Sequence, residues 1–333
     1  MGILVMYPGP SRVKKAISFE TLENVTFMKI LVATEKPFAK AAVDGIREIV
    51  EGAGYELALL EKYADKAELL AAVADADGLI VRSDKVTREV IDAARNLKIV
   101  VRAGAGYDNV DLAACTERGI VVMNTPGQNS NAVAELVVSM MIFISRNQFT
   151  PGTGAEVSGK RLGIHAYGNV GRIVARYGRA LGMSVKAFDP FVDPRQLEAD
   201  GVEAVGTVEE LYASSDYVSL HIPATDQTRG SIGYELLSSM PKGGVLINTA
   251  RKEVIDEQGL IRAFEERADL KYITDIAAEA QPLLTEKFGK RVFATPKKMG
   301  AETAEANINA GLAAARQIVD FFKTGDTRFQ VNR

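Results

Sequence analysis

The sequence predicts an α/β protein with two doubly wound parallel sheets and a cleft between them. From Met28 onward, short apolar runs of strand length alternate with amphipathic stretches of helical period, which is the pattern of repeated βα units. The alternation breaks once, in the polar loop 124–129, and resumes after the glycine-rich stretch 151–159. A chain of 333 residues has the length of about two domains, each large enough to bury its own core.

The first unit begins at the apolar run that follows Met28, and residues 1–27 are interpreted as an N-terminal extension. Its predicted strands are 29–33, 55–60, 78–82, 98–102 and 119–123, and its predicted helices are 41–51, 66–76, 87–96 and 111–117. Residues 131–145 then form a long apolar helix with few charges. A helix of that composition is buried on most sides, either at a domain junction or against another subunit.

The second unit carries strands near 161–166, 184–188, 217–222, 244–249, 270–276 and 291–295. The last helical pattern, 301–322, starts at this unit and, at about 1.5 Å per residue, is long enough to return to the first. We therefore predict a discontinuous first domain, 28–126 with 310–333, and a second domain, 127–309. Ligands of such sheets bind beyond the carboxyl ends of the strands, which places the candidate site in the cleft.

Composition excludes several classes of function. The 40 Lys and Arg residues face 43 Asp and Glu residues, and the net charge of −3 provides no basic face for nucleic acid. The single cysteine, Cys115, excludes internal disulfides and cysteine zinc clusters, and no metal site is predicted. The apolar run 3–6 is too short to span a membrane and has no basic flank, so a cytoplasmic location is expected. Both histidines, His165 and His221, lie in predicted strands, and neither is expected to be catalytic.

The second unit opens with a dinucleotide-binding pattern. Ala166, Gly168 and Gly171 are spaced as A-x-G-x-x-G between a strand and a helix, and Asp189 ends the next strand 23 positions after Ala166. Glycines let the chain approach a pyrophosphate at the helix N-terminus, and the acid accepts hydrogen bonds from ribose hydroxyls. Because no basic residue stands at 190–193, a 2′-phosphate would be repelled, which favours NAD over NADP. The alternative interpretation is a tight strand-to-helix turn without a ligand.

Further stretches complete a family pattern: 101–111 (VRAGAGYDNVD), 124–126 with 133–136 (NTP, VAEL) and 248–251 (NTAR). In this order, and from Met28 to the C-terminus, the chain resembles the D-isomer-specific 2-hydroxyacid dehydrogenases. The resemblance implies a flavodoxin-like substrate domain and a Rossmann NAD-binding domain. Within the family, the chain is most similar to the branch that oxidises D-3-phosphoglycerate in serine biosynthesis, in its short form without a C-terminal regulatory domain.

The resemblance also assigns site residues. Those implied to hold NAD are Gly168, Asn169, Val170, Asp189, Thr228, Thr249, Ala250, Asp275 and Gly300. The substrate carboxylate would meet Arg251 and the backbone amides of a small-residue loop suited to an anion, Ala103, Gly104 and Ala105. A substrate phosphate would need further cations, and the candidates are Arg82, Ser83 and Lys85. The alternative is that these three residues form a solvated loop end.

The family's catalytic histidine is absent. It normally follows Thr-Pro directly. In this chain Thr-Pro at 295–296 is followed by Lys297, Lys298, Met299 and Gly300, so the segment between Thr-Pro and the glycine is one residue longer than in the family. Alignment on the glycine places Lys298 at the histidine position, and alignment on Thr-Pro places Lys297 there. We favour Lys298, because the glycine contacts the cofactor and fixes the local register. The alternative is that both lysines form a solvated pair.

The glutamate that accompanies the family's histidine is displaced as well, since its expected position is Ala280 and Glu279 comes one residue early. A carboxylate would hold the proton on a lysine, whereas a base needs a pKa lowered by burial, by Arg251 and by Lys297. Loss of the glutamate and gain of the lysine are therefore interpreted as one change.

Together, these features predict NAD-dependent oxidation of D-3-phosphoglycerate, with Arg251 as the carboxylate clamp and Lys298 as the acid/base. The alternatives are an enzyme for D-glycerate, hydroxypyruvate or glyoxylate, and a non-catalytic NAD(H)-sensing module. The apolar helix 132–144 also predicts a homodimer, because leaving such a helix exposed would be costly.

Overall fold

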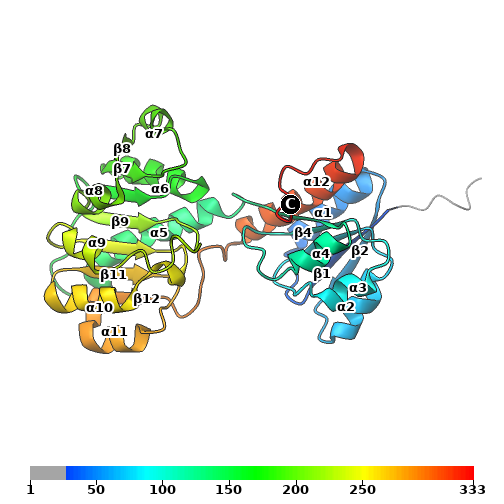
Figure 1. Ribbon diagram of the computed structural model, residues 1–333, viewed down its shortest axis with the longest axis horizontal. Coiled ribbons are helices and arrows are strands. Elements are labelled where there is room, and N and C mark those ends of the chain that lie inside the picture. The colour runs from blue at the N-terminus through cyan, green and yellow to red at the C-terminus, as the bar shows by residue number, and fades with distance from the viewer. Residues whose placement is uncertain (1–27) are drawn as a thin grey trace, which may run out of the picture.

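The computed structural model describes residues 28–333, and the predicted N-terminal extension 1–27 lies outside this range. The described chain forms two parallel-sheet units that lie next to each other along the longest axis of the molecule (Figure 1). They are named here the β1–β5 unit and the β6–β12 unit after their strands. The predicted fold class, two doubly wound α/β units, is confirmed.

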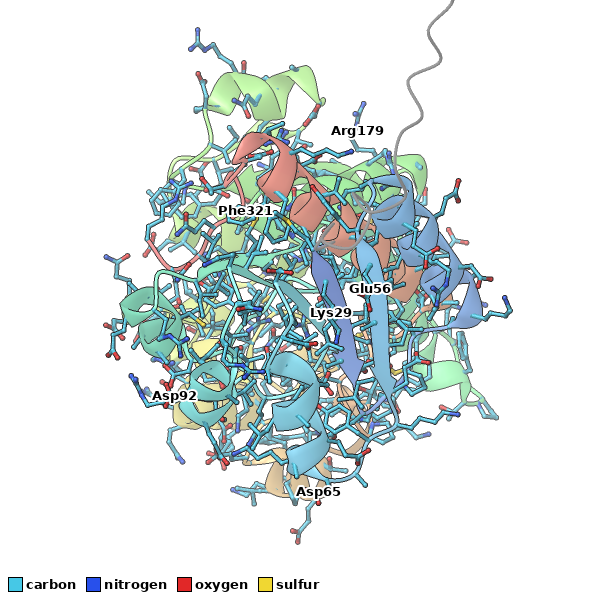
Figure 2. All side chains as sticks on the ribbon, turned by 90° about the vertical axis from the view of Figure 1, so that its right-hand side faces the viewer. Lys29, Glu56, Asp65, Asp92, Arg179 and Phe321 are labelled. Atoms are coloured by element: carbon cyan, nitrogen blue, oxygen red, sulfur yellow. The ribbon has the colours of Figure 1, made fainter. Side chains whose placement is uncertain are left out.

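The β1–β5 unit has the strand order β2-β1-β3-β4-β5, and every neighbouring pair is parallel. This is the flavodoxin-like order. The strands are β1 (Lys29–Thr34), β2 (Glu56–Glu61), β3 (Gly78–Val81), β4 (Ile99–Arg102) and β5 (Val121–Asn124). Figure 2 looks onto this unit, where Lys29 and Glu56 begin two neighbouring strands in matched register.

Helices cover both faces of this sheet, which explains why its strands read as continuous apolar runs. One face packs against α1 (Lys40–Gly52) and α12 (Ala304–Thr324). The other face packs against α2 (Lys66–Val73), α3 (Arg88–Ala93) and α4 (Leu112–Glu117).

The β6–β12 unit has the strand order β12-β11-β10-β9-β6-β7-β8, again parallel throughout. Its strands are β6 (Arg161–His165), β7 (Ser184–Phe188), β8 (Glu203–Ala204), β9 (Tyr217–Leu220), β10 (Val245–Asn248), β11 (Lys271–Thr274) and β12 (Val292–Ala294). The order reverses between β6 and β9, and such a switch point is where dinucleotides bind in open α/β sheets. The sequence prediction missed β8, because two residues carry no readable period.

Helices also cover both faces of the second sheet. The core on one face is closed by α5 (Ser130–Ser145), α6 (Asn169–Ala180) and α7 (Pro194–Ala199). The core on the other face is closed by α8 (Val208–Ala213), α9 (Tyr234–Ser239), α10 (Glu257–Glu266) and α11 (Gln281–Phe288). Short 3₁₀ turns occupy Asn147–Phe149, Lys252–Val254 and Gly289–Arg291. Within residues 28–333, no helix is both long and apolar enough to cross a membrane.

Helix α12 returns the chain from the second unit to the first, as the sequence predicts. The Thr303 hydroxyl caps its first turn by accepting a hydrogen bond from the Ala306 amide at 3.1 Å. Small residues then allow α12 to approach α1 closely, with Ala314 and Ile318 completely buried against the sheet. In Figure 1 this red helix lies beside α1 and begins where the chain leaves the β6–β12 unit.

Candidate active site

The loop between β6 and α6 has the backbone that a dinucleotide pattern requires. Ala166 stands at the usual first glycine and has a φ of +80°, in the region that glycine adopts without strain. A Cβ on Gly171 would overlap the Ala166 carbonyl oxygen, so this glycine lets α6 approach β6. A Cβ on Gly168 would meet nothing within 4 Å. The loop therefore leaves open space at the N-terminus of α6, where a pyrophosphate fits.

Asp189 lies at the carboxyl end of β7, next to this loop. Its Oδ2 accepts a hydrogen bond from the Tyr167 amide at 2.8 Å, and its Oδ1 accepts one from the Phe191 amide at 2.9 Å. These bonds orient the carboxylate, and each oxygen retains a lone pair for a ribose hydroxyl. The next basic side chain along the chain, Arg195, is paired with Asp193 and does not neutralise Asp189.

Asp275 follows β11 and is completely buried. Its Oδ2 accepts hydrogen bonds from the amides of Gly300 at 2.8 Å and Met299 at 3.3 Å. Its Oδ1 is buried without a hydrogen-bond partner among residues 28–333, and so is the Thr249 hydroxyl. Burial raises the pKa of Asp275, while the two amides and Lys298 oppose the rise. Unsatisfied buried acceptors of this kind fit a ligand with N–H donors, such as a nicotinamide carboxamide.

The other residues implied to hold the cofactor have mainly structural contacts. The Thr228 hydroxyl is engaged within its own turn, where it donates to the Pro223 carbonyl at 2.5 Å and accepts from the Thr225 amide at 2.8 Å. The Ala250 amide donates to the Asn248 side chain at 3.0 Å and fixes the turn after β10. Asn169 and Val170 form the first turn of α6, which begins at Asn169.

Arg251 faces the small-residue loop of the other unit. A Cβ on Gly106 would lie 3.9 Å from Arg251 Nη2, so the loop after β4 and the guanidinium after β10 are close neighbours. The structure also corrects one expectation for this loop. The Ala103 amide donates to the Val81 carbonyl at 2.8 Å and the Gly104 amide to the Arg102 carbonyl at 2.9 Å. Only the Ala105 amide of the three is without an acceptor in the described chain.

Arg102, which the sequence analysis did not single out, lies beside the same loop. Its guanidinium folds across Gly104, where a Cβ would overlap it, and its Nε donates to the Arg82 carbonyl at 3.0 Å. Burial lowers the pKa of Arg102, and Arg82 and Arg251 lower it further, whereas Asp108 opposes them. Its position directly before the small-residue loop is the sequence signal that could have identified it.

The three phosphate candidates differ in their surroundings. Arg82 is half-buried, and its Nη1 donates to the carbonyls of Lys36 at 3.0 Å and Pro37 at 3.2 Å. Ser83 and Lys85 are exposed, and their side chains make no hydrogen bond within the described residues. The Arg82 guanidinium is therefore fixed by hydrogen bonds, whereas the side chains of Ser83 and Lys85 have none among the described residues.

Lys298 lies where charged groups of the site act on its pKa. Burial lowers the pKa of Lys298 and Arg251 lowers it further, whereas Asp275 and Glu253 act in the opposite direction. The Lys298 side chain is nevertheless exposed, as is that of Lys297, so this desolvation is partial. The contribution expected from Lys297 stays a prediction, since Lys297 is not among the largest influences on the Lys298 pKa.

Glu279 does not take the place of the family's glutamate. Its carboxylate pairs with the Lys252 ammonium at 3.1 Å and its side chain is 83% exposed. The backbone amides of Glu279 and Ala280 both donate to the Glu257 carboxylate at 2.8 Å, which fixes the start of α11. Among the described residues the Glu279 carboxylate is bound to Lys252, and no hydrogen bond or ion pair joins it to Lys298.

The two histidines lie at the ends of β6 and β9, and the His221 amide donates to the His165 carbonyl at 2.9 Å. Burial lowers the pKa of His165 to about 4 and that of His221 to about 3, so both rings are neutral at pH 7. His165 packs edge-on against Tyr212 and Phe188. Neither ring is among the largest influences on the pKa of Lys298. Among the described residues there is also no cluster of side chains suited to a metal ion.

Comparison with known proteins places the chain in a family. The model for the catalytic domain of D-isomer specific 2-hydroxyacid dehydrogenases matches residues 31–332. D-3-phosphoglycerate dehydrogenase of Methanocaldococcus jannaschii is 39% identical over 271 residues, which cover 76% of this chain and 51% of that protein. Hydroxypyruvate reductase of Thermotoga maritima is 36% identical over 284 residues, which cover 79% of this chain and 90% of that protein.

A solved structure extends the similarity to three dimensions. NAD⁺-bound 3-phosphoglycerate dehydrogenase of Entamoeba histolytica is 52% identical and superposes with a TM-score of 0.81, over 92% of this chain and 99% of that one. The chain spans about half the length of the archaeal phosphoglycerate dehydrogenases it matches, 51% and 59%. The family model and the relatives agree with the two-sheet architecture: the chain belongs to the D-isomer specific 2-hydroxyacid dehydrogenase family.

Proposed function

We propose that the protein oxidises D-3-phosphoglycerate to 3-phosphohydroxypyruvate with NAD, the first step of serine biosynthesis. The observation that carries this proposal is the set of cations at the contact between the two units. The Arg102 guanidinium lies across Gly104 and its Nε donates to the Arg82 carbonyl, and a Cβ on Gly106 would lie 3.9 Å from Arg251 Nη2. Arg251 and Arg102 both lower the pKa of Lys298, so this lysine is near them. Such a set suits a small substrate with two anionic groups, a carboxylate and a phosphate.

Residues of the β6–β12 unit would hold NAD, which supplies the acceptor of the hydride. The open space beside Gly168 suits the pyrophosphate, and Asp189 suits the adenosine ribose. The unpartnered Asp275 Oδ1 and Thr249 hydroxyl suit polar groups of the nicotinamide end, with Ala250 and Gly300 as close backbone neighbours. Thr228 would act by holding its turn, since its hydroxyl is already engaged.

The protein's own residues have distinct roles in the reaction. Arg251 binds the substrate carboxylate, which the Ala105 amide can also reach as a donor, and Arg102 adds positive charge beside them. Lys298 accepts the proton of the C2 hydroxyl as the hydride leaves C2, so the lysine must be neutral before the reaction. Its lowered pKa makes the neutral form more available than that of an ordinary lysine.

The relatives support both this substrate and a runner-up. The proteins of Methanocaldococcus jannaschii and Entamoeba histolytica are named for phosphoglycerate, whereas the Thermotoga maritima protein, whose length the chain nearly matches, is named for hydroxypyruvate. Arg82 favours phosphoglycerate, because a guanidinium fixed by hydrogen bonds can pair with a phosphate. The unphosphorylated acid has only an uncharged hydroxymethyl group in place of that phosphate.

The test compares kcat/KM for D-3-phosphoglycerate and D-glycerate with NAD as cofactor. We expect a preference for the phosphorylated acid that largely disappears in Arg82→Ala. Equal values for both acids in the wild type would favour the hydroxypyruvate reductase assignment. A sensing module would be favoured if the protein binds NAD but oxidises neither acid and does not reduce glyoxylate.

A homodimer and a cytoplasmic location accompany this function as proposals. Helix α5 presents apolar side chains that are only partly buried, among them Leu136, Val138 and Ile142, and Phe149 beyond it is 70% exposed. A second copy of the chain is proposed to cover them. Light scattering at micromolar concentration is expected to give twice the chain mass, and a monomer would contradict this proposal.

A further inference from the structure

Asn307, on the first turns of α12, holds the guanidinium of Arg82 at the end of β3. Arg82 Nη2 donates to Asn307 Oδ1 at 2.5 Å, across 225 positions of sequence. The Asn307 Nδ2 donates to the Thr303 carbonyl at 2.8 Å. Only the amide orientation with its oxygen toward Arg82 satisfies both partners, so the side chain has one defined position.

The remaining contacts of Arg82 leave one edge of its guanidinium free. Both Nη1 hydrogens are used by the carbonyls of Lys36 and Pro37, and the guanidinium carbon lies 5.2 Å from the centre of the Phe38 ring. Within residues 28–333, Nε has no acceptor, and Nη2 has only Asn307. Nε and Nη2 share the edge with which arginine binds phosphate through two parallel hydrogen bonds.

The support of Arg82 is continuous with the segment that carries Lys298. Thr303, which anchors the Asn307 amide, lies three residues after Gly300, whose amide is bound to Asp275 at 2.8 Å. Thr303 also caps α12 through the Ala306 amide. A shift of this segment would therefore move Asn307 and, through it, the Arg82 guanidinium.

We propose that Asn307 is a positioning residue that presents the free edge of Arg82 to the phosphate of the substrate. It touches neither substrate nor cofactor and acts only through Arg82. This inference rests on the proposed function, because it requires a phosphorylated substrate. It assigns to α12 a part in substrate selectivity in addition to its place in the fold.

The test uses Asn307→Leu, which keeps the size of the side chain and removes the acceptor, in the full chain. The matched control is Asn309→Leu, because Asn309 lies on the same helix, is exposed and makes no side-chain hydrogen bond in the described structure. Asn307→Gln retains an amide oxygen and serves as the conservative variant. For each, kcat and KM are measured with D-3-phosphoglycerate and D-glycerate, together with the melting temperature.

For Asn307→Leu we expect KM for D-3-phosphoglycerate to rise about tenfold, the scale of a hydrogen bond to a charged group, with kcat nearly unchanged. Values for D-glycerate should stay unchanged, Asn309→Leu should behave as the wild type, and Asn307→Gln should recover much of the loss. In Arg82→Ala, adding Asn307→Leu should have no further effect, because the two residues act as one unit.

Four results would overturn the inference. If Asn307→Leu leaves KM for D-3-phosphoglycerate unchanged while Arg82→Ala raises it, the proposed function stands and the role of Asn307 is wrong. If Asn307→Leu impairs both acids equally, or adds to Arg82→Ala, the residue is structural. A wild type that does not prefer the phosphorylated acid overturns the phosphate assignment and this role together.

Discussion

The amide of Gly300 donates a hydrogen bond to Asp275 Oδ2 at 2.8 Å, and the other oxygen of that carboxylate is buried without a partner in the described chain. A Cβ on Gly300 would lie 3.0 Å from the same carboxylate, so only glycine allows this approach without adjustment. The contact anchors the segment 297–300 at its last residue, Gly300. Lys298 lies two positions earlier, and Arg251 and Asp275 are among the charges that act on its pKa.

The pH dependence of oxidation should report Lys298. Because the base must be neutral, kcat/KM should rise with pH and level off above a pKa lower than the ordinary lysine value of 10.5. Reduction of the keto acid needs the protonated lysine, so its rate should fall through the same pKa. In Arg251→Gln, loss of the nearby positive charge should move the rising limb to higher pH. If kcat/KM instead levels off above about pH 6.5, the ordinary histidine pKa, the lysine assignment is contradicted.

Lys298 should also destabilise the fold at neutral pH. Its pKa is lower in the folded protein than in the unfolded chain, so the charged form is disfavoured by folding. The penalty is complete below the folded pKa and disappears as pH rises toward the unfolded value. We therefore expect Lys298→Met to melt at a higher temperature than the wild type at pH 7, with a smaller difference at pH 10. An equal or lower melting temperature at pH 7 would show that folding does not disfavour the charged form of Lys298.

The dinucleotide loop allows a separation of folding from cofactor binding. Gly168→Ala adds a methyl group where no protein atom lies within 4 Å, so the melting temperature of the free protein should hardly change. The same methyl group would occupy the approach to the pyrophosphate, and NAD affinity measured by calorimetry should fall at least tenfold. Unchanged affinity would mean that the cofactor does not approach this glycine.

Ala166→Gly is the counterpart in the same loop. The φ of +80° costs an alanine about 1 kcal/mol relative to a glycine. The substitution removes this cost, but the greater freedom of glycine in the unfolded chain offsets part of the gain in stability. The variant should be as stable as the wild type or slightly more stable, and should bind NAD normally. A clear loss of stability in urea unfolding would contradict the strain inferred at this position.

The fold class could be predicted from the sequence, because most strands are short apolar runs separated by helical stretches. The apolar segment 131–145 is helix α5, Ser130–Ser145, and the final pattern is helix α12. The short strand β8 could not be predicted, since two residues define no alternation.

The site was less predictable, because it depends on which hydrogen bonds are already made. Small residues at 103–105 suggest free amides, yet two of the three amides are used by neighbouring carbonyls. Glu279 stands one residue from the expected position, but only the structure reveals its pairing with Lys252. The contact that makes Asn307 relevant joins it to Arg82, 225 positions away in sequence, and no local pattern encodes it.

The central claim is that Lys298 is the acid/base of an NAD-dependent dehydrogenase, and Lys298→Ala tests it against Lys297→Ala. With D-3-phosphoglycerate and NAD, we expect kcat of Lys298→Ala to fall about 10²–10⁴-fold, the usual contribution of general acid/base catalysis, while NAD affinity stays unchanged. Lys297→Ala should retain kcat within about twofold, because the Lys297 ammonium makes no hydrogen bond or ion pair among the described residues. Turnover near the wild-type rate in Lys298→Ala, or the larger loss in Lys297→Ala, would contradict the account.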